Sequence, residues 1–324
     1  MQIPLMKKPV LLVLFLASHF CFSQKNENNF QPFLPEIITQ FPNVRDFAVS
    51  ADETEIYFTA QSYLSEASTI IYCNQVNGKW YTPQVAPFSG MYQDIEPFLT
   101  ADGLKLYFVS NRPIVPRTIK SKDFDIWMVK RHDANSSWSI PENIGSPVNT
   151  AEDEFYPSVS KYNNLCFTRD GAGSKGKDDI FYCKWQDGKY AEPFSMSDSI
   201  NSDGYEFNAF LATDESYILY TCYNKKGGLG SGDIYISYKK QNDEWSLAEN
   251  LGPEVNSVQM DYCPYVNSAT GMMYYTSKRT TVKKQFERSQ KLTEFLKEVN
   301  KYDNGQSRIY RIDISNLIET TTRK

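Results

Sequence analysis

The stretch ADGLKLYFVSNR, residues 101–112, combines a tight turn, a strand and an abrupt polar end. Its Asp-Gly pair is typical of a turn. The alternating bulk of Leu104, Leu106 and Phe108 then predicts a β-strand that ends at the polar Ser-Asn-Arg. The chain contains four further copies of this phrase, which indicates a repeated structural unit.

Each copy reads as strand, turn, strand, long loop, strand, turn, strand, although the fifth copy lacks its fourth strand. The copies are separated by 50, 60, 52 and 55 residues when anchored at Phe47, Pro97, Pro157, Ala209 and Pro264. Periods of this size with aromatic-rich strands are typical of a β-propeller, in which each repeat forms one four-stranded blade. The 22 Tyr and 20 Phe residues suit packing between twisted blades.

The N-terminal segment offers the missing strand. FQPFLPEIITQFPN, residues 30–43, resembles SWSIPENIGSPVN, residues 137–149, at the end of the second copy. We therefore predict an all-β, five-bladed propeller of four-stranded antiparallel blades over residues 44–324, with residues 25–43 completing the last blade and closing the ring. Six blades are the alternative, but the segment fits one strand better than four.

The phrases ADGLKLYFVSNR, DIWMV, DIFYC, GDIYIS and YYTSKR resemble the repeats of TolB-type propellers, which carry the WD-like (PD-type) repeat of bacterial envelope proteins. The resemblance covers residues 44–314. It implies a propeller in an envelope setting and says less about function, because propellers host binding, scaffolding and catalysis.

The first residues predict export. Lys7 and Lys8 precede an apolar run over residues 9–17, which is typical of a signal peptide, here residues 1–24. The run is too short to span a membrane. A lipid anchor at Cys21 is less favoured, because bulky residues precede it where a lipoprotein cleavage site needs small ones. We expect a periplasmic or secreted protein without a transmembrane segment.

Composition excludes several classes of function. The formal net charge of −5 argues against nucleic acid as a partner. The cysteines beyond the leader are scattered on strands without CxxC spacing, which predicts buried thiols. Only His132 remains beyond the leader, and we interpret it as a solvated turn residue. Histidine-dependent nucleophiles and catalytic zinc are therefore not expected, and we predict no metal site and no cofactor.

Carboxylates recur three residues before four of the anchors, where the inner strand of a blade begins. The long loops between second and third strands lie at the same end, over residues 112–124, 170–178, 223–232 and 280–307. In a structural interpretation each acid accepts N–H bonds at a strand start. In a functional one, crowded acids at the channel mouth bind a cation, a basic peptide or a sugar. The acids are Asp94, Glu154, Glu206 and Asp261, with Asp46 and Glu96 close by.

Arginines end the second strands, and aspartates begin the third strands. We predict that Arg112 pairs with Asp125 and that Arg169 pairs with Asp179, which would tie down the loop between each pair. The candidate ligand-binding residues are then Asp94, Glu96, Glu154, Glu206, Asp261, Arg112, Arg169 and Arg279.

Two glycine-rich loops partly resemble phosphate-binding motifs. GAGSKGKD, residues 171–178, has Asp178 where a P-loop needs Ser or Thr. Neither it nor GGLGSG, residues 227–232, leads into a helix, so the helix dipole that binds phosphate is missing. We interpret both as hairpin loops.

The last long loop departs from the repeat. Residues 282–302 place apolar side chains near helical spacing, which predicts an amphipathic helix inserted into the fifth blade. The helix either packs on the propeller or docks a partner. Its apolar residues are Phe286, Leu292, Phe295, Leu296 and Val299.

These features favour a monomeric, non-catalytic propeller that binds a protein or peptide as a scaffold in the cell envelope. The alternative is a carbohydrate-binding protein or a glycoside hydrolase, since hydrolysis needs only two suitably spaced acids. A structural cation at the channel mouth is a third, weaker option. The candidate catalytic acids of the hydrolase are Asp46, Asp94, Glu154 and Glu206.

Overall fold

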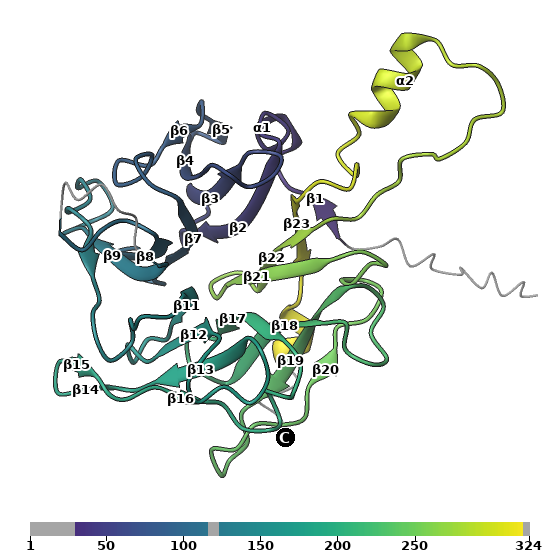
Figure 1. The fold of residues 1–324 in the computed structure, drawn as a ribbon. Helices are drawn as coiled ribbons and strands as arrows, with labels where there is room; N and C mark the ends of the chain where they lie inside the picture. The colour runs from purple at the N-terminus through teal and green to yellow at the C-terminus, as the bar shows by residue number, and fades with distance from the viewer. Residues whose placement is uncertain (1–29, 116–122, 320–324) are drawn as a thin grey trace, which may run out of the picture.

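The computed structural model describes residues 30–115 and 123–319 as a ring of antiparallel sheets around one axis (Figure 1). The predicted signal peptide, residues 1–24, and the lipid anchor considered at Cys21 lie outside the described residues. Within the described ranges, no helix is long and apolar enough to cross a bilayer. The five sheets confirm the predicted five-bladed propeller.

Each blade runs from an inner strand at the axis to an outer strand at the rim. The first blade consists of β2 (Asn43–Val49), β3 (Glu55–Gln61), β4 (Ser68–Val76) and β6 (Gln84–Val85). The second consists of β7 (Asp94–Leu99), β8 (Lys105–Ser110), β9 (Asp125–Lys130) and β10 (Glu142–Asn143). The third consists of β11 (Glu154–Val159), β12 (Leu165–Arg169), β13 (Asp179–Cys183) and β16 (Phe194–Ser195). The fourth consists of β17 (Glu206–Leu211), β18 (Tyr217–Tyr223), β19 (Gly232–Tyr238) and β20 (Glu249–Asn250). The fifth consists of β21 (Asp261–Asn267), β22 (Met272–Ser277), β23 (Arg308–Asp313) and β1 (Gln31–Pro32). Short additions are β5 (Lys79–Trp80) on the first blade, the hairpin of β14 (Trp185–Gln186) and β15 (Lys189–Tyr190), and the C-terminal α3 (Ser315–Glu319).

The N-terminal strand closes the ring as predicted. Strand β1 pairs antiparallel with β23, with Gln31 opposite Arg311. The chain then turns from the rim to the axis through a short helix, α1 (Pro35–Ile38), which the sequence did not suggest. Proline is tolerated in the first turn of a helix, and α1 buries two isoleucines, so the return path to β2 is packed.

Aromatic side chains of the second strands form the core between blades. All five are fully buried, which confirms the pattern read from the repeats. Rings suit this position because flat faces fill the space between twisted sheets. The five residues are Phe58, Phe108, Phe167, Tyr220 and Tyr275.

Every inner strand carries an irregularity at the same position of the repeat. The register shifts there, and the residue takes a left-handed φ of 51–57°. Such a bulge turns a side chain away from the regular alternation of the strand. The residues are Asp46, Glu96, Tyr156, Asn208 and Cys263.

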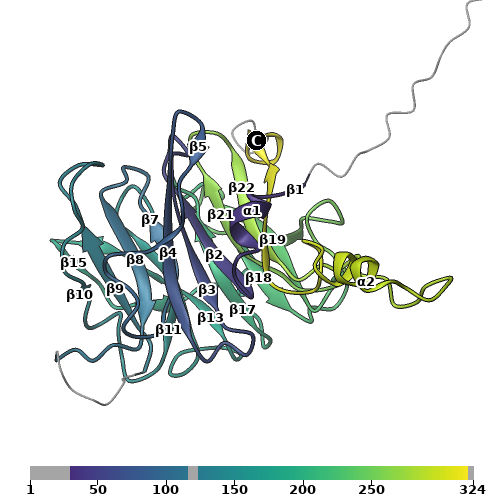
Figure 2. The ribbon, with the colours of Figure 1, turned by 90° about the horizontal axis from the view of Figure 1, so that it is seen from above.

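Two further expectations concern exposed and buried side chains. His132 is solvated, with 93% of its side chain exposed. The five cysteines among the described residues are free thiols and all are buried. In the insertion, the helix covers only Leu292–Val299, as α2, and it stands off the body of the propeller (Figures 1 and 2).

Candidate functional site

The carboxylates that begin the inner strands hold the connections between blades. Three of them accept bonds from both the backbone N–H and the hydroxyl of the Ser or Thr four residues earlier. The hydroxyl distances are 2.6 Å for Thr150 to Glu154, 2.6 Å for Ser202 to Glu206 and 2.7 Å for Ser257 to Asp261. Asp94 is held equivalently by Ser89 and Gly90.

The first blade has Val44 at this position. The chain reaches it from the N-terminal segment rather than from a preceding blade, and Val44 N–H donates to the carbonyl of Ser307. A carboxylate is therefore absent where there is no blade-to-blade connection to hold. This pattern agrees with the structural interpretation of the acids.

An asparagine before each of these Ser or Thr residues completes the connection. Asn256 accepts the N–H of Ile234 and donates to its carbonyl, so its amide replaces a strand partner. Asn149 and Asn201 do the same in the preceding blades. The pattern N-[ST]-x-x-x-[DE] occurs three times in the sequence, and it could have predicted these three connections.

The arginines do not pair as predicted. Arg112 Nη2 lies 2.7 Å from Asp94 Oδ1, and Arg279 Nη2 lies 3.0 Å from Asp261 Oδ1. Arg169 approaches Glu154 at 3.9 Å. Each arginine therefore reaches the inner strand of its own blade, and the predicted pairs of Arg112 with Asp125 and Arg169 with Asp179 are wrong.

The glycine-rich loops explain where the aspartate of the third strand finds its partners. Asp179 accepts the backbone N–H groups of Lys175 and Gly176, and Asp233 accepts those of Leu229 and Gly230. The anion bound by each loop is thus the protein's own carboxylate. In the third blade, Asp179 is therefore already satisfied by this loop, and Arg169 approaches Glu154 on the inner strand instead.

The bulged residues meet at the axis. The guanidinium of Arg45 donates to Asp46 Oδ1 at 2.8 Å and to Glu96 Oε1 at 2.9 Å. The thiol of Cys263 donates to the same oxygen of Asp46 at 2.8 Å. The backbone N–H of Tyr156 donates to Glu96 Oε2 at 2.6 Å. Side chains from the first, second and fifth blades and the backbone of the third therefore fill the channel.

Burial, together with the charge of Asp46, raises the pKa of Glu96 to about 8. Burial also raises the pKa of Glu154 to about 7. A carboxyl group that retains its proton at neutral pH is what a general acid requires. Asp46 is 0% exposed and Glu96 is 4% exposed, however, so a substrate has no access to this pair.

The four candidate catalytic acids are not brought together. Asp46 lies at the axis, whereas Asp94, Glu154 and Glu206 are committed to separate blade connections. Among the described residues, no three His, Cys, Asp or Glu side chains form a group that could hold a metal ion.

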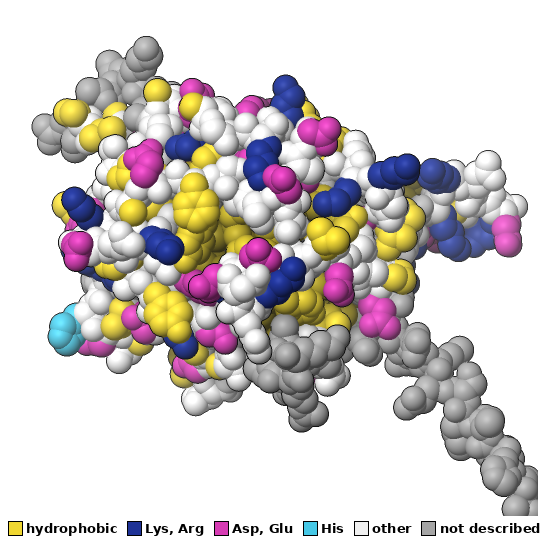
Figure 3. Space-filling model, turned by 90° about the horizontal axis from the view of Figure 1, so that it is seen from below, with side chains coloured by type: hydrophobic (Ala, Val, Ile, Leu, Met, Phe, Trp, Pro, Cys, Tyr) yellow, Lys and Arg dark blue, Asp and Glu magenta, His cyan; other side chains and the backbone are white. Residues whose placement is uncertain are grey.

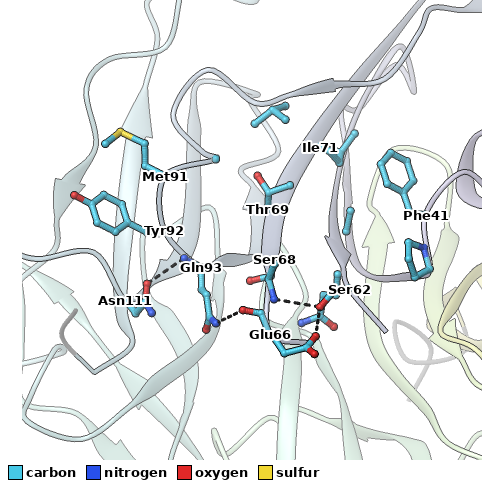
Figure 4. A pocket seen from close by; sticks show the side chains of 16 residues that line it. Phe41, Ser62, Glu66, Ser68, Thr69, Ile71, Met91, Tyr92, Gln93 and Asn111 are labelled. Carbon is cyan, nitrogen blue, oxygen red and sulfur yellow. Dashed lines mark hydrogen bonds between the residues drawn. The ribbon is translucent and has the colours of Figure 1, made fainter. Parts of the chain in front are cut away.

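One hollow on the surface was not anticipated from the sequence. A pocket of about 780 Å³ lies between the first and second blades, at the loop-rich end (Figure 4). Its lining brings together the end of β3, the start of β4 and the connection that leads into β7. Apolar lining comes from Phe41, Ile71, Val85, Met91 and Tyr92, and polar lining from Ser62, Glu66, Thr69, Gln93 and Asn111.

Hydrogen bonds fix the polar side of this pocket. Gln93 N–H donates to Asn111 Oδ1 at 3.1 Å, and its side-chain amide donates to the carbonyl of Glu66 at 2.8 Å. Met91 is 84% exposed beside this ordered rim. A second hollow of about 500 Å³ shares Phe41 and Pro42 with the pocket and continues toward the base of α2.

A smaller hollow of about 340 Å³ lies at the outer edges of the third and fourth blades. Figure 3 faces these edges and shows apolar side chains gathered in a hollow with charged groups around it. Tyr182, Phe194 and Trp245 contribute rings. Glu215 at this site is already engaged by Tyr182 and Lys239.

No protein-family model matches the chain, and no curated protein is similar to it in sequence. Among solved structures, BT0996 in its RGII complex is similar at a TM-score of 0.52 and 9% identity, covering 83% of this protein and 86% of that one. TolB from Acinetobacter baumannii is similar at 0.44 and 11% identity, with 84% and 54% covered, so the chain spans about half of that structure. An α-L-arabinofuranosidase from Lactobacillus brevis is similar at 0.47 and 12%, with 82% and 89% covered. At these identities the likeness concerns the propeller fold alone.

Proposed function

We propose that this chain is a non-catalytic propeller that binds a protein or peptide segment at the pocket between its first and second blades. The proposal rests on the contrast between this open, mainly apolar pocket and the carboxylates of the channel, which are buried and hydrogen-bonded within the protein. Apolar burial would supply affinity, and the ordered amides of Gln93 and Asn111 would orient the bound segment.

The shape of the site favours an extended ligand. The pocket and the adjoining hollow share Phe41 and Pro42 as lining, so the two hollows are neighbours on the surface. An extended segment can place an apolar side chain in the pocket while its backbone continues toward the neighbouring hollow. The envelope location remains part of the proposal, supported by the N-terminal apolar run and by the resemblance of the repeats.

The proposal is tested with a random peptide library displayed on phage. We expect enrichment of peptides with an aromatic or aliphatic anchor on the parent protein, and at least tenfold weaker binding to Met91→Glu. Ile140→Glu is the matched control. Ile140 is 82% exposed and lies near the opposite end of the second blade, so its variant should bind like the parent. Equal enrichment on Met91→Glu, or none on the parent, would refute the proposal.

Glycan hydrolysis is the second candidate, and the raised pKa of Glu96 beside Asp46 is the observation in its favour. A hydrolase should release sugar from polysaccharide or aryl glycoside substrates and lose that turnover in Glu96→Gln. We expect no turnover in either protein, because both carboxyl groups are enclosed by Arg45, Tyr156 and Cys263.

A further inference from the structure

The insertion, residues 282–302, presents an apolar stripe to solvent. Helix α2 stands away from the blades (Figures 1 and 2), and within the described residues none of its side chains is buried. Leu292 is 71% exposed, Phe295 47% and Leu296 45%. With Val299 these residues follow the i, i+3, i+4, i+7 spacing of one helix face.

A helix of eight residues is marginal by itself. The start of α2 is stabilised locally, because Glu294 accepts the backbone N–H of Lys291 and pairs with Arg288 at 2.7 Å. Its end is linked by Lys301 to Glu298. These contacts order the segment without covering the apolar stripe, which is therefore available to an external surface.

The charge of the insertion is opposite to that of the rest of the protein. Six Lys or Arg and three Glu give it a net charge of +3, so the remainder carries −8 of the total of −5. Four lysines of the insertion form no ion pair with any residue that the structure describes. They are Lys283, Lys284, Lys291 and Lys297.

We propose that the insertion docks the propeller on an anionic lipid surface. An apolar stripe with Phe and Leu, flanked by lysines, is the chemistry that enters the boundary between headgroups and acyl chains. Unpaired lysines would gain from negative headgroups. Because the rest of the protein is acidic and would be repelled, a helix held away from the body is suited to make this contact. The inference is independent of the peptide-binding proposal.

Sedimentation with lipid vesicles tests the inference. We expect at least tenfold tighter binding to vesicles of phosphatidylcholine with phosphatidylglycerol than to phosphatidylcholine alone. The double substitution Phe295→Ser with Leu296→Ser should weaken binding to the anionic vesicles at least tenfold. Lys283→Gln with Lys284→Gln should weaken it severalfold and reduce its dependence on salt. Ile140→Ser, at an exposed apolar position on the second blade, is the control and should bind as the parent does.

All variants carry the same N-terminus as the parent, so any contribution of the apolar run at residues 9–17 cancels. The substituted side chains are exposed, and unchanged thermal unfolding checks that the propeller is intact. Equal binding to neutral and anionic vesicles would overturn the inference, as would binding that survives the double substitution. Self-association in the absence of lipid, lost in Phe295→Ser with Leu296→Ser, would assign the stripe to a second copy and also overturn it. Met91→Glu should bind vesicles normally, which separates this result from the peptide site.

Discussion

Arg112 Nη2 lies 2.7 Å from Oδ1 of Asp94, and this ion pair joins the end of a second strand to the start of the inner strand in the same blade. Ser110, two residues before the arginine, is opposite Asp94 on one side and Asp125 on the other. The guanidinium also donates to the carbonyl of Phe88, in the connection from the first blade. One side chain therefore joins the inner strand to the incoming connection.

Removing this arginine should be costly. Arg112→Gln leaves the buried carboxylate of Asp94 without its charge partner, and we expect a loss of about 3–5 kcal/mol in the free energy of unfolding. Urea denaturation of the purified protein measures it. Lys130→Gln, which breaks an exposed pair with Glu142, is the control and should cost about 0–1 kcal/mol. Similar losses for the two variants would contradict the structural role of Arg112.

The third blade should be less sensitive to the same change. Arg169 approaches Glu154 at 3.9 Å, and its Nε has no hydrogen-bond partner among the described residues. Arg169→Gln should therefore destabilise the protein by no more than about half as much as Arg112→Gln. Urea midpoints of the two variants, measured side by side, give the comparison. An equal or larger loss for Arg169→Gln than for Arg112→Gln would contradict the weaker role of this contact.

Asn256 should be essential to the connection between the fourth and fifth blades. Asn256→Ala leaves the N–H and the carbonyl of Ile234 without their side-chain partners, at about 1–3 kcal/mol for a buried polar group. Hydrogen exchange should show faster exchange of the Ile234 amide. Asn242→Ala, in an exposed turn, is the matched control and should leave both stability and exchange unchanged.

Gly230 is required by close packing. A Cβ at this position would overlap the carbonyl oxygen of Gln259, so Gly230→Ala must displace backbone between two blades. We expect a loss of about 1–3 kcal/mol or more. Gly78→Ala is the comparison, since a Cβ there meets nothing within 4 Å and only its positive φ opposes the change. Thermal unfolding should rank Gly230→Ala clearly below Gly78→Ala.

The proton on Glu96 predicts a pH dependence of stability. Its pKa is raised from 4.5 to about 8 in the folded protein. Between these values the folded state holds a proton that the unfolded chain releases, so the stability from this group is complete below about pH 4.5 and is lost as pH rises through 8.

Glu96→Gln should remove much of this slope, because glutamine is neutral at every pH. At pH 8 we expect the free energy of unfolding of the variant to exceed that of the parent by at least about 1.4 kcal/mol, which is the equivalent of one pKa unit. Urea denaturation at pH 5 and pH 8 measures it. A parent whose stability rises from pH 5 to pH 8, or an unchanged slope in Glu96→Gln, would contradict the prediction. Glu154, with its pKa raised to about 7, should leave a smaller slope of the same sign.

Much of the channel could not be predicted from the repeats. The bulged position holds five different residue types, among them Asp46, Tyr156 and Cys263, so no repeated chemistry marks it in the sequence. Its members lie about 50 residues apart and meet only because the ring closes. The pocket beside Met91 was missed for a similar reason, since its lining comes from two blades and from the segment that precedes the first.

The blades, their number and the closing strand could be read from the repeats. Strand alternation, turn residues and aromatic positions act over a few neighbouring residues, so each repeat specifies its own sheet. The partner that each charged group takes depends instead on how the folded blades and their connections are arranged. Arg112 could reach an acid on either flanking strand, and the choice of Asp94 depends on the carbonyl of Phe88, which the preceding connection brings to the same side. Contacts between blades follow from ring geometry, and a linear pattern does not carry that information.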